Sequence, residues 1–185
     1  MNYLPFIVLI VLVVIIIFAF IGLYNRLVSL REMIKNAWSQ IDVQLKRRHD
    51  LIPNLIETVK GYKDYEKSTL EAVIKARNIA MGASSIEDKQ LAENQLSGTL
   101  KSLFALSEAY PDLKADTSFL QLQEELTATE SKIAFARQYY NDTVNVFNAS
   151  IKTFPAVMFA ASWGFTEQKY FEIMDADREV PQVKF

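Results

Sequence analysis

The first 24 residues carry no charged side chain, and this stretch limits the possible fold more than any other feature of the sequence. Leu4 to Leu23 are apolar apart from Pro5 and Gly22, and a helix of that length measures roughly 30 Å, the thickness of the hydrocarbon core of a bilayer. A cleaved signal peptide would need a basic residue before a shorter apolar run, but no Lys or Arg precedes this one. We therefore predict that residues 1–24 are a transmembrane anchor.

Basic residues lie on only one side of the predicted anchor. Arg26, Arg31 and Lys35 follow it, and an excess of positive charge marks the cytoplasmic side of a span. The sequence therefore predicts a single-pass protein of the cell (inner) membrane, with its N-terminus outside and its helical domain in the cytoplasm. The same three side chains are predicted to contact anionic lipid head groups. The alternative is that their charge serves topology alone.

Beyond the anchor, apolar residues recur every three or four positions, which is the period of an amphipathic helix. No segment shows the alternation typical of a strand. Helices that each bury one apolar stripe pack as a bundle. The fold class predicted is all-α: an N-terminal transmembrane helix, an antiparallel up-and-down four-helix bundle over residues 25–172, and a tail at 173–185. The predicted helices cover residues 25–62, 66–82, 87–109 and 117–152, and the first two could be one bent helix.

Two local signals refine these helices. Pro53 lacks a backbone N–H, so we expect either a kink near His49 or Asp50 or a new helix that starts with Asp50 as its cap. Ser84 with Glu87 fits a capping box, in which a hydroxyl and the residue three positions later satisfy free amides of the first turn.

Polar residues interrupt the apolar stripes of the first and last helices. A charge that is buried without a partner costs several kcal/mol, so Arg48 is expected to pair with Glu130, and Arg137 with Glu108 or Asp50. Two alternatives stay open: a polar ligand pocket inside the bundle, and contacts with solvent or another subunit. The predicted internal network consists of Arg48, Asp50, Asn54, Glu108, Glu130, Arg137, Asn141 and Asn148.

A second uncharged segment, FPAVMFAASWGF, covers residues 154–165. Twelve residues are too few to span a bilayer, and an up-and-down bundle would return the last helix to the membrane side. We predict that this segment lies at the membrane-proximal end, as a cap on the bundle, a subunit contact or an insertion into lipid. Its candidate contact residues are Phe154, Pro155, Phe159, Trp163 and Phe165.

The composition argues against most enzyme classes. The chain has no Cys and a single His, so thiolate metal sites and Cys nucleophiles are excluded, and no phosphate-binding glycine motif occurs. We predict no catalytic residue, no metal and no cofactor. The net charge of -2 also offers no basic surface for nucleic acid.

Several longer motifs closely resemble the LemA family. The resemblance implies a bacterial or archaeal membrane protein with one N-terminal span, a bundle akin to the bromodomain arrangement and no enzymatic activity, and magnetosome relatives imply a part in membrane organisation or biogenesis. The matching motifs are Tyr24–Val28, Ala37–Leu45, Arg47–Arg48, Asp50–Leu55, Val59–Tyr62, Glu108–Lys114, Glu130–Ala134, Ala136–Arg137, Tyr140–Asn141, Asn148 and Phe154–Pro155.

Two function classes remain after these exclusions. The first is a membrane-anchored, non-enzymatic scaffold or interaction protein that associates with itself, as a homo-oligomer, or with other membrane proteins. The second is a ligand-sensing or accessory module with a polar pocket inside the bundle. In both cases the anchor contacts membrane lipid. The first class is favoured by the anchor, the helical surface and the lack of any catalytic group of residues.

Overall fold

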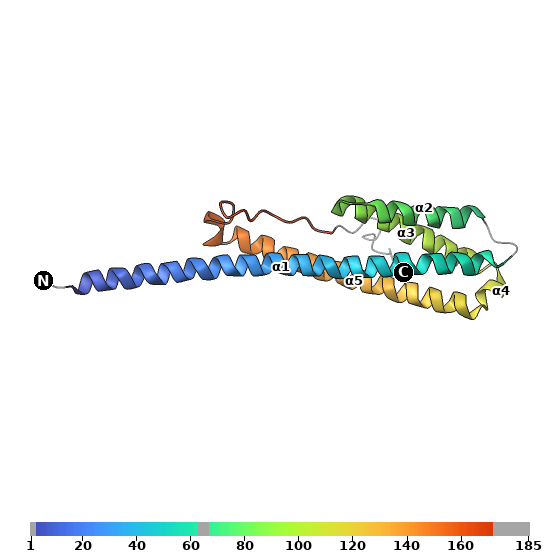
Figure 1. The fold of residues 1–185 in the computed structure, drawn as a ribbon, viewed down its shortest axis with the longest axis horizontal. Helices are drawn as coiled ribbons and strands as arrows, with labels where there is room; N and C mark the ends of the chain where they lie inside the picture. The colour runs from blue at the N-terminus through green and yellow to red at the C-terminus, as the bar shows by residue number, and fades with distance from the viewer. Residues whose placement is uncertain (1–2, 63–66, 172–185) are drawn as a thin grey trace, which may run out of the picture. The chain divides into compact units, whose positions relative to one another are not determined.

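The computed structural model describes residues 3–62 and 67–171, and within these ranges the chain is helical nearly throughout, with no strand (Figure 1). The all-α class is therefore confirmed. The first two predicted helices are separate, and the anchor and the first predicted helix are one continuous element. The elements are α1 (Leu4–Lys60), α2 (Lys67–Gly82), α3 (Ile86–Ser107), α4 (Pro111–Lys114), α5 (Thr117–Lys152) and the short 3₁₀ helix η1 (Ala156–Met158).

The chain divides into two compact units. Unit 1 comprises Met1–Ser39 and Gln138–Tyr170, and unit 2 comprises Gln40–Arg137 and Phe171–Phe185. Both α1 and α5 contribute residues to each unit. The predicted tail at 173–185 lies outside the described residues.

Unit 2 is a four-helix bundle of α1, α2, α3 and α5. The α1 and α5 helices run in opposite directions. Arg48 contacts Glu130, and farther along the chain from Arg48, Tyr62 donates to Asp116 (2.7 Å), which precedes Glu130 in the chain. The α3 helix runs parallel to α1, since Asp42 pairs with Lys89 and Arg48 with the later residue Glu93. The core is built from the predicted apolar stripes, including Ile52, Leu55, Val73, Leu96, Leu100 and Phe119.

In unit 1, α1 and α5 pack against each other. Leu27 and Ile34 of α1 and Val144 and Phe147 of α5 are buried, at the positions that the helical period predicts for a core. An extended segment from Thr166 to Tyr170 comes after α5 and η1 in the chain. Tyr140 on α5 donates its hydroxyl to the carbonyl oxygen of Lys169 (3.0 Å), so this segment is tied to α5.

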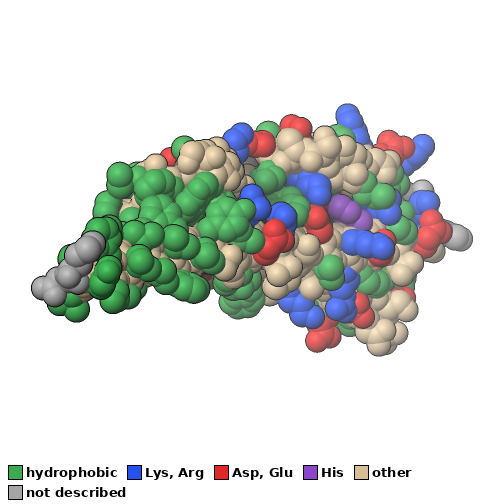
Figure 2. Space-filling model, turned by 60° about the vertical axis from the view of Figure 1, so that its left-hand side comes forward, with side chains coloured by type: hydrophobic (Ala, Val, Ile, Leu, Met, Phe, Trp, Pro, Cys, Tyr) green, Lys and Arg blue, Asp and Glu red, His purple; other side chains and the backbone are tan. Residues whose placement is uncertain are grey.

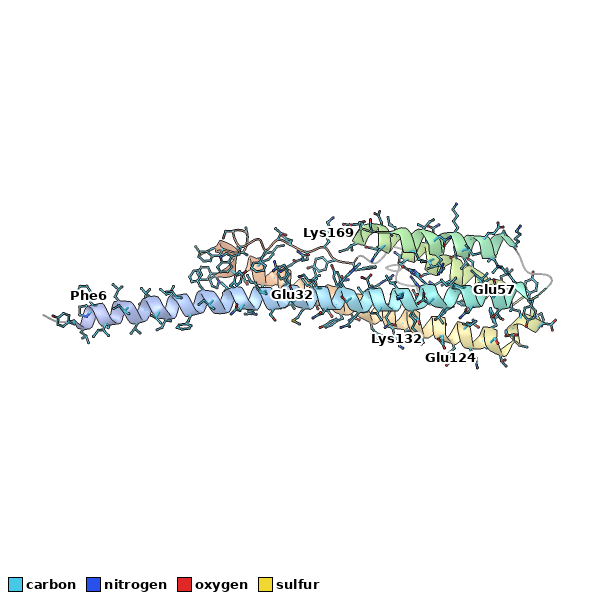
Figure 3. All side chains as sticks on the ribbon, viewed as in Figure 1. Phe6, Glu32, Glu57, Glu124, Lys132 and Lys169 are labelled. Atoms are coloured by element: carbon cyan, nitrogen blue, oxygen red, sulfur yellow. The ribbon has the colours of Figure 1, made fainter. Side chains whose placement is uncertain are left out.

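The first part of α1 is apolar on every side. Its side chains from Leu4 to Gly22 are exposed, and an 18-residue window reaches a mean hydropathy of 3.6. Figure 3 shows these side chains standing out around the helix near Phe6, and Figure 2 shows a hydrophobic surface there. Among the described helices, only α1 is long and apolar enough to cross a membrane. An apolar surface of this kind points to membrane association.

The α1 helix continues through Pro53 without a break, so the predicted alternative of a new helix capped by Asp50 is wrong. Proline cannot donate to the carbonyl four residues earlier, which belongs to His49. Arg77 on α2 supplies the missing donor, because its Nε lies 2.8 Å from the His49 oxygen. A side chain from a neighbouring helix therefore compensates for the lost backbone hydrogen bond.

The predicted cap of α3 is wrong by one residue. Ser85, not Ser84, precedes the first turn, and its hydroxyl accepts a hydrogen bond from the backbone N–H of Asp88 (3.0 Å). Asp88 accepts in return from the Ser85 hydroxyl (2.7 Å). The pattern of a hydroxyl and an acid three residues apart occurs twice in succession here, and the sequence does not show which register the turn adopts.

Candidate functional site

A group of charged side chains, buried on α1 and α3 and partly exposed on α5, joins three helices of unit 2. The side chain of Arg48 on α1 is 0 % exposed and that of Glu93 on α3 is 1 % exposed, and the two form an ion pair between Nη2 and Oε2. The other terminal nitrogen, Nη1, pairs with Oε2 of Glu130 on α5 and donates to the hydroxyl of Ser97 (2.8 Å). Ser97 donates in turn to Oε1 of Glu130 (2.9 Å). We call Arg48, Glu93, Ser97 and Glu130 the buried ion cluster.

The helical period explains why Arg48 and Glu93 lie in the core. Arg48 follows Ile41 by seven residues and precedes Ile52 by four, so its side chain leaves α1 on the apolar face. Charges in this position need full pairing, because an isolated buried charge is strongly unfavourable. The sequence analysis missed Glu93. Its signal was present, because Glu93 precedes Leu96 by three residues and thus shares the buried stripe of α3.

His49 extends the cluster on the α1 side. Its Nε2 lies 2.9 Å from Oε1 of Glu93, so both carboxylate oxygens of Glu93 face nitrogen atoms. Burial raises the pKa of Glu93, but the adjacent His49 ring and the positive charge of Arg48 outweigh it, and the pKa lies below its ordinary value of 4.5. Glu93 is therefore ionised at neutral pH.

The lowered pKa of Glu93 predicts an acid-sensitive bundle. The folded protein holds the ionised form more strongly than the unfolded chain does, so the stabilisation is complete above the ordinary value of 4.5 and is lost as the pH falls through the folded pKa. We expect the melting temperature of the detergent-solubilised protein to drop below about pH 4.5, with a shallower acid dependence in Glu93→Gln. An equally steep acid dependence in that variant would contradict the prediction.

Arg137 is only partly buried and lies against an aromatic ring. Its guanidinium carbon lies 4.5 Å from the ring centroid of Phe171. Burial lowers the pKa of Arg137 and the positive charge of Arg48 adds to that effect, while Glu130 and Glu93 oppose it. Neither Nε nor Nη2 of Arg137 has a hydrogen-bond partner among the described residues. The expected pairing with Glu108 or Asp50 is wrong.

Three predicted network members are exposed and do not belong to an internal network. Asp50 and Asn54 lie on the outside of α1, and Glu108 forms an exposed ion pair with Lys114. Asp50 is two residues beyond Arg48, and this spacing rotates its side chain by about 200° around the helix, away from the core. Glu108 lies beyond the end of α3, where the helical period no longer predicts direction.

Asn148 and Asn141 lie in unit 1. Asn148 is buried, its Nδ2 donates to the carbonyl oxygen of Gln168, and its Oδ1 accepts from the backbone N–H of Gln168, both at 2.9 Å. Its amide therefore pairs with the extended segment through two hydrogen bonds rather than with a charged side chain. Asn141 is half-buried on the same helix.

Replacing Asn148 by alanine is expected to release the extended segment locally. Both backbone groups of Gln168 would lose their partner, at a cost of about 1–3 kcal/mol. Amides 166–171 should then exchange hydrogen faster, whereas Asp142→Ala, an exposed substitution on the same helix, should leave them unchanged. Unaltered exchange in Asn148→Ala would refute this role.

The uncharged segment packs against α1 where its apolar stretch ends. The ring of Phe159 lies 4.7 Å from that of Phe20, and the ring of Trp163 lies 5.5 Å from that of Tyr24. Phe165 is buried, with its ring 5.7 Å from Tyr24. The other two candidate contact residues of this segment, Phe154 and Pro155, are exposed.

The three predicted head-group residues have different surroundings. Arg26 is exposed, while the guanidinium carbon of Arg31 lies 5.1 Å from the ring centroid of Phe165. Lys35 forms an ion pair with Glu32 at 2.7 Å. Because that pair offsets the charge of Lys35, we expect Arg26 and Arg31 to contribute more than Lys35 to any attraction by anionic lipid.

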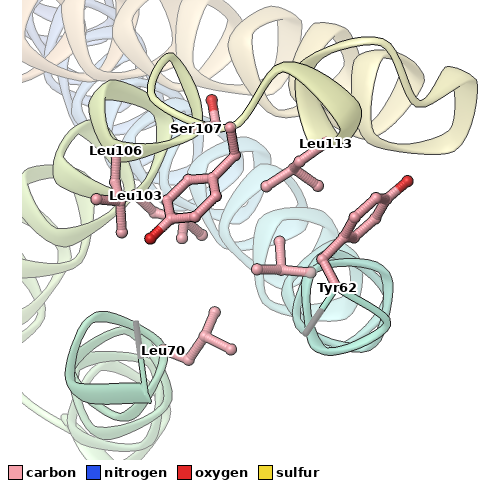
Figure 4. Close-up of a pocket in the computed structure, with 8 residues that line it drawn as sticks. Tyr62, Leu70, Leu103, Leu106, Ser107 and Leu113 are labelled. Carbon is pink, nitrogen blue, oxygen red and sulfur yellow. The ribbon is translucent and has the colours of Figure 1, made fainter. Parts of the chain in front are cut away.

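The structure shows a small cavity in unit 2 and a larger open hollow along α2. No three His, Cys, Asp or Glu side chains among the described residues are placed to hold a metal ion. A cavity in unit 2 has a volume of about 20 Å³, which is room for a single water molecule. Figure 4 shows Leu70, Leu103 and Leu113 among the side chains that surround it.

The chain is similar to proteins of one family. The sequence model of the LemA family matches residues 37–185. A protein named Protein LemA from Metamycoplasma hominis is 31% identical over 141 residues, which cover 74% of this chain and 63% of that protein. Magnetosome protein MamQ 2 from Paramagnetospirillum magneticum is 24% identical over 175 residues, 80% of this chain and 64% of that protein.

A further relative agrees with these matches. Magnetosome protein MamQ from Magnetospirillum gryphiswaldense is 24% identical over 174 residues, with coverage of 80% and 64%. The chain thus spans less than two thirds of the length of these relatives. None of their names is that of an enzyme. Because the family match covers most of the sequence, the chain belongs to the LemA family.

Proposed function

We propose that this protein is a membrane-anchored, non-enzymatic scaffold that associates with further copies of itself and, through the same surface, with other membrane proteins. The observation that carries the proposal is an outward apolar stripe on α5 within unit 1. Tyr139 and Val146 are 43% and 48% exposed. Their spacing of seven residues places them within about 20° of each other around the helix.

Such a stripe fits association between helices. Aromatic side chains are enriched in protein interfaces, and large apolar groups repeated along one helix pack against a matching helix. The alternative, a ligand-sensing module with a polar pocket inside the bundle, has less support. The groups that would line that pocket, Arg48, Glu93 and Glu130, pair with one another.

The mass of the full chain in mild detergent tests this proposal. We expect a discrete oligomer, and we expect Val146→Glu to reduce its mass to that of a monomer because a charge would enter the interface. Leu91→Glu, on an exposed apolar residue of α3, is the matched control and should leave the oligomer intact. A monomeric parent protein that binds a small molecule would favour the ligand-sensing alternative.

The orientation of the chain is part of the proposal. The basic residues after the apolar stretch support an N-terminus outside the cell and a bundle in the cytoplasm. Because the sequence contains no cysteine, a single Asp50→Cys variant provides a unique labelling site. A maleimide that cannot cross the membrane should leave it unlabelled in intact cells and label it after lysis. Labelling in intact cells would refute this orientation.

A further inference from the structure

We propose that residues 154–163 form a second membrane contact, in which Phe154, Val157 and Met158 enter the interface of the bilayer that α1 crosses. These three side chains are 79%, 52% and 64% exposed. Their neighbours Ala156 and Ala160 are buried, so the segment has an apolar inner face and an equally apolar outer face. The occupant proposed for the outer face is lipid.

The depth of the segment follows from its contacts with α1. Phe159 and Trp163 lie 4.7 and 6.2 Å from Phe20, measured between ring centroids. Phe20 is three residues from Leu23, the end of the apolar stretch, and thus about 5 Å inside it along the helix axis. The length of that stretch matches the hydrocarbon core. A ring that touches Phe20 therefore lies at the edge of the hydrocarbon core.

The charges around the segment agree with this depth. No residue from Thr153 to Thr166 is charged. Lys152 and Glu167 stand at its two ends and pair with each other at 2.7 Å. The loop is therefore an uncharged unit closed at its base by one ion pair. This arrangement lets the loop enter an apolar phase while both charges stay at the water side.

Much of the backbone of the segment is hydrogen-bonded internally, which suits a lipid environment. Polar backbone groups must be satisfied internally in a hydrocarbon environment. Seven amides, those of residues 157–160 and 163–165, donate to carbonyl oxygens between Thr153 and Ala161. Gly164 closes this turn with a φ of 77°. Its N–H donates to the carbonyl oxygen of Ala161, and the N–H of Phe165 donates to that of Ala160, so the two hydrogen bonds form the Schellman pattern.

Lipid fits the outer face better than a second protein copy because the face continues an apolar surface. Phe20 belongs both to the predicted span and to the contact with the segment. Trp163 and Tyr24, which contact each other at 5.5 Å, are the residue types that favour the membrane–water interface. One bilayer can therefore cover the apolar stretch of α1 and the outer face of the segment together.

Spin labels on single cysteines can measure this depth, because the natural chain contains none. A nitroxide on Val157→Cys would be studied in the full-length protein in vesicles of phosphatidylcholine and phosphatidylglycerol. We expect strong relaxation by oxygen, which concentrates in lipid, and weak relaxation by a water-soluble nickel chelate. The oxygen-to-nickel ratio should exceed that of Val43→Cys several-fold. Val43 is an exposed residue of α1, about 35 Å beyond Phe20 along the helix.

Ile15→Cys in the apolar stretch serves as the lipid reference. If its label is lipid-accessible while the Val157 label is accessible to nickel, the proposed second contact is refuted. Protection of the Val157 label from both reagents, with spin–spin broadening between copies, would assign the face to a second copy and would also overturn the proposal. Met158→Cys repeats the measurement at a second exposed site, so that failure of one variant to fold does not decide the outcome.

Discussion

Replacing Arg48 by alanine is expected to lower the free energy of unfolding of the bundle by about 3–5 kcal/mol. Arg48 is the one residue that pairs with both Glu93 and Glu130 among the described ion pairs. Without it, the carboxylate of Glu93 stays buried with only His49 beside it. Urea unfolding of the full chain in detergent, followed by far-UV circular dichroism, measures this loss.

A neighbouring arginine provides the control for this experiment. Arg47 pairs with Glu125 at 3.4 Å, and both side chains are about half exposed, so Arg47→Ala should cost less than about 1 kcal/mol. The double variant Arg48→Met with Glu93→Leu should recover much of the loss, because it removes both buried charges. Equal effects of Arg48→Ala and Arg47→Ala would show that the buried ion cluster does not hold the bundle together.

Replacing Phe165 by alanine is expected to destabilise unit 1 by about 3–5 kcal/mol. The ring is buried, and its centroid lies 5.7 Å from that of Tyr24 and 6.3 Å from that of Phe147, so its removal leaves a cavity between three elements. Arg31 would also lose the ring beneath its guanidinium. Faster hydrogen exchange of amides 157–165 measures the loss.

Tyr170→Ala separates this packing effect from a general loss of aromatic surface. Tyr170 follows the same segment but is exposed, so its replacement should change the exchange of amides 157–165 very little. If both variants accelerate exchange equally, the buried contacts of Phe165 are not what holds the segment against α1.

The sequence predicts those members of the internal site that interrupt the apolar stripe of their own helix. Arg48 and Glu130 interrupt apolar stripes, and the structure brings this expected pair together. The place of Glu93 on the buried stripe of α3 could have been predicted, but its partner Arg48 lies 45 positions earlier in the chain, and no local pattern connects the two. Asn148 was placed in the same network, but its partner is the backbone of Gln168, which sequence patterns do not reveal.

The long helices, the apolar stretch of α1 and the all-α class were predictable from the sequence alone, because helical period and hydrophobicity are properties of nearby residues. The motifs of the sequence also identified the LemA family, which the family match confirms. Other contacts are known from the folded structure and not from sequence patterns: Glu93 with Arg48, Arg77 with the carbonyl left free by Pro53, and Phe159 with Phe20. These contacts join residues far apart in the chain, and they depend on how whole helices pack, which no local pattern specifies.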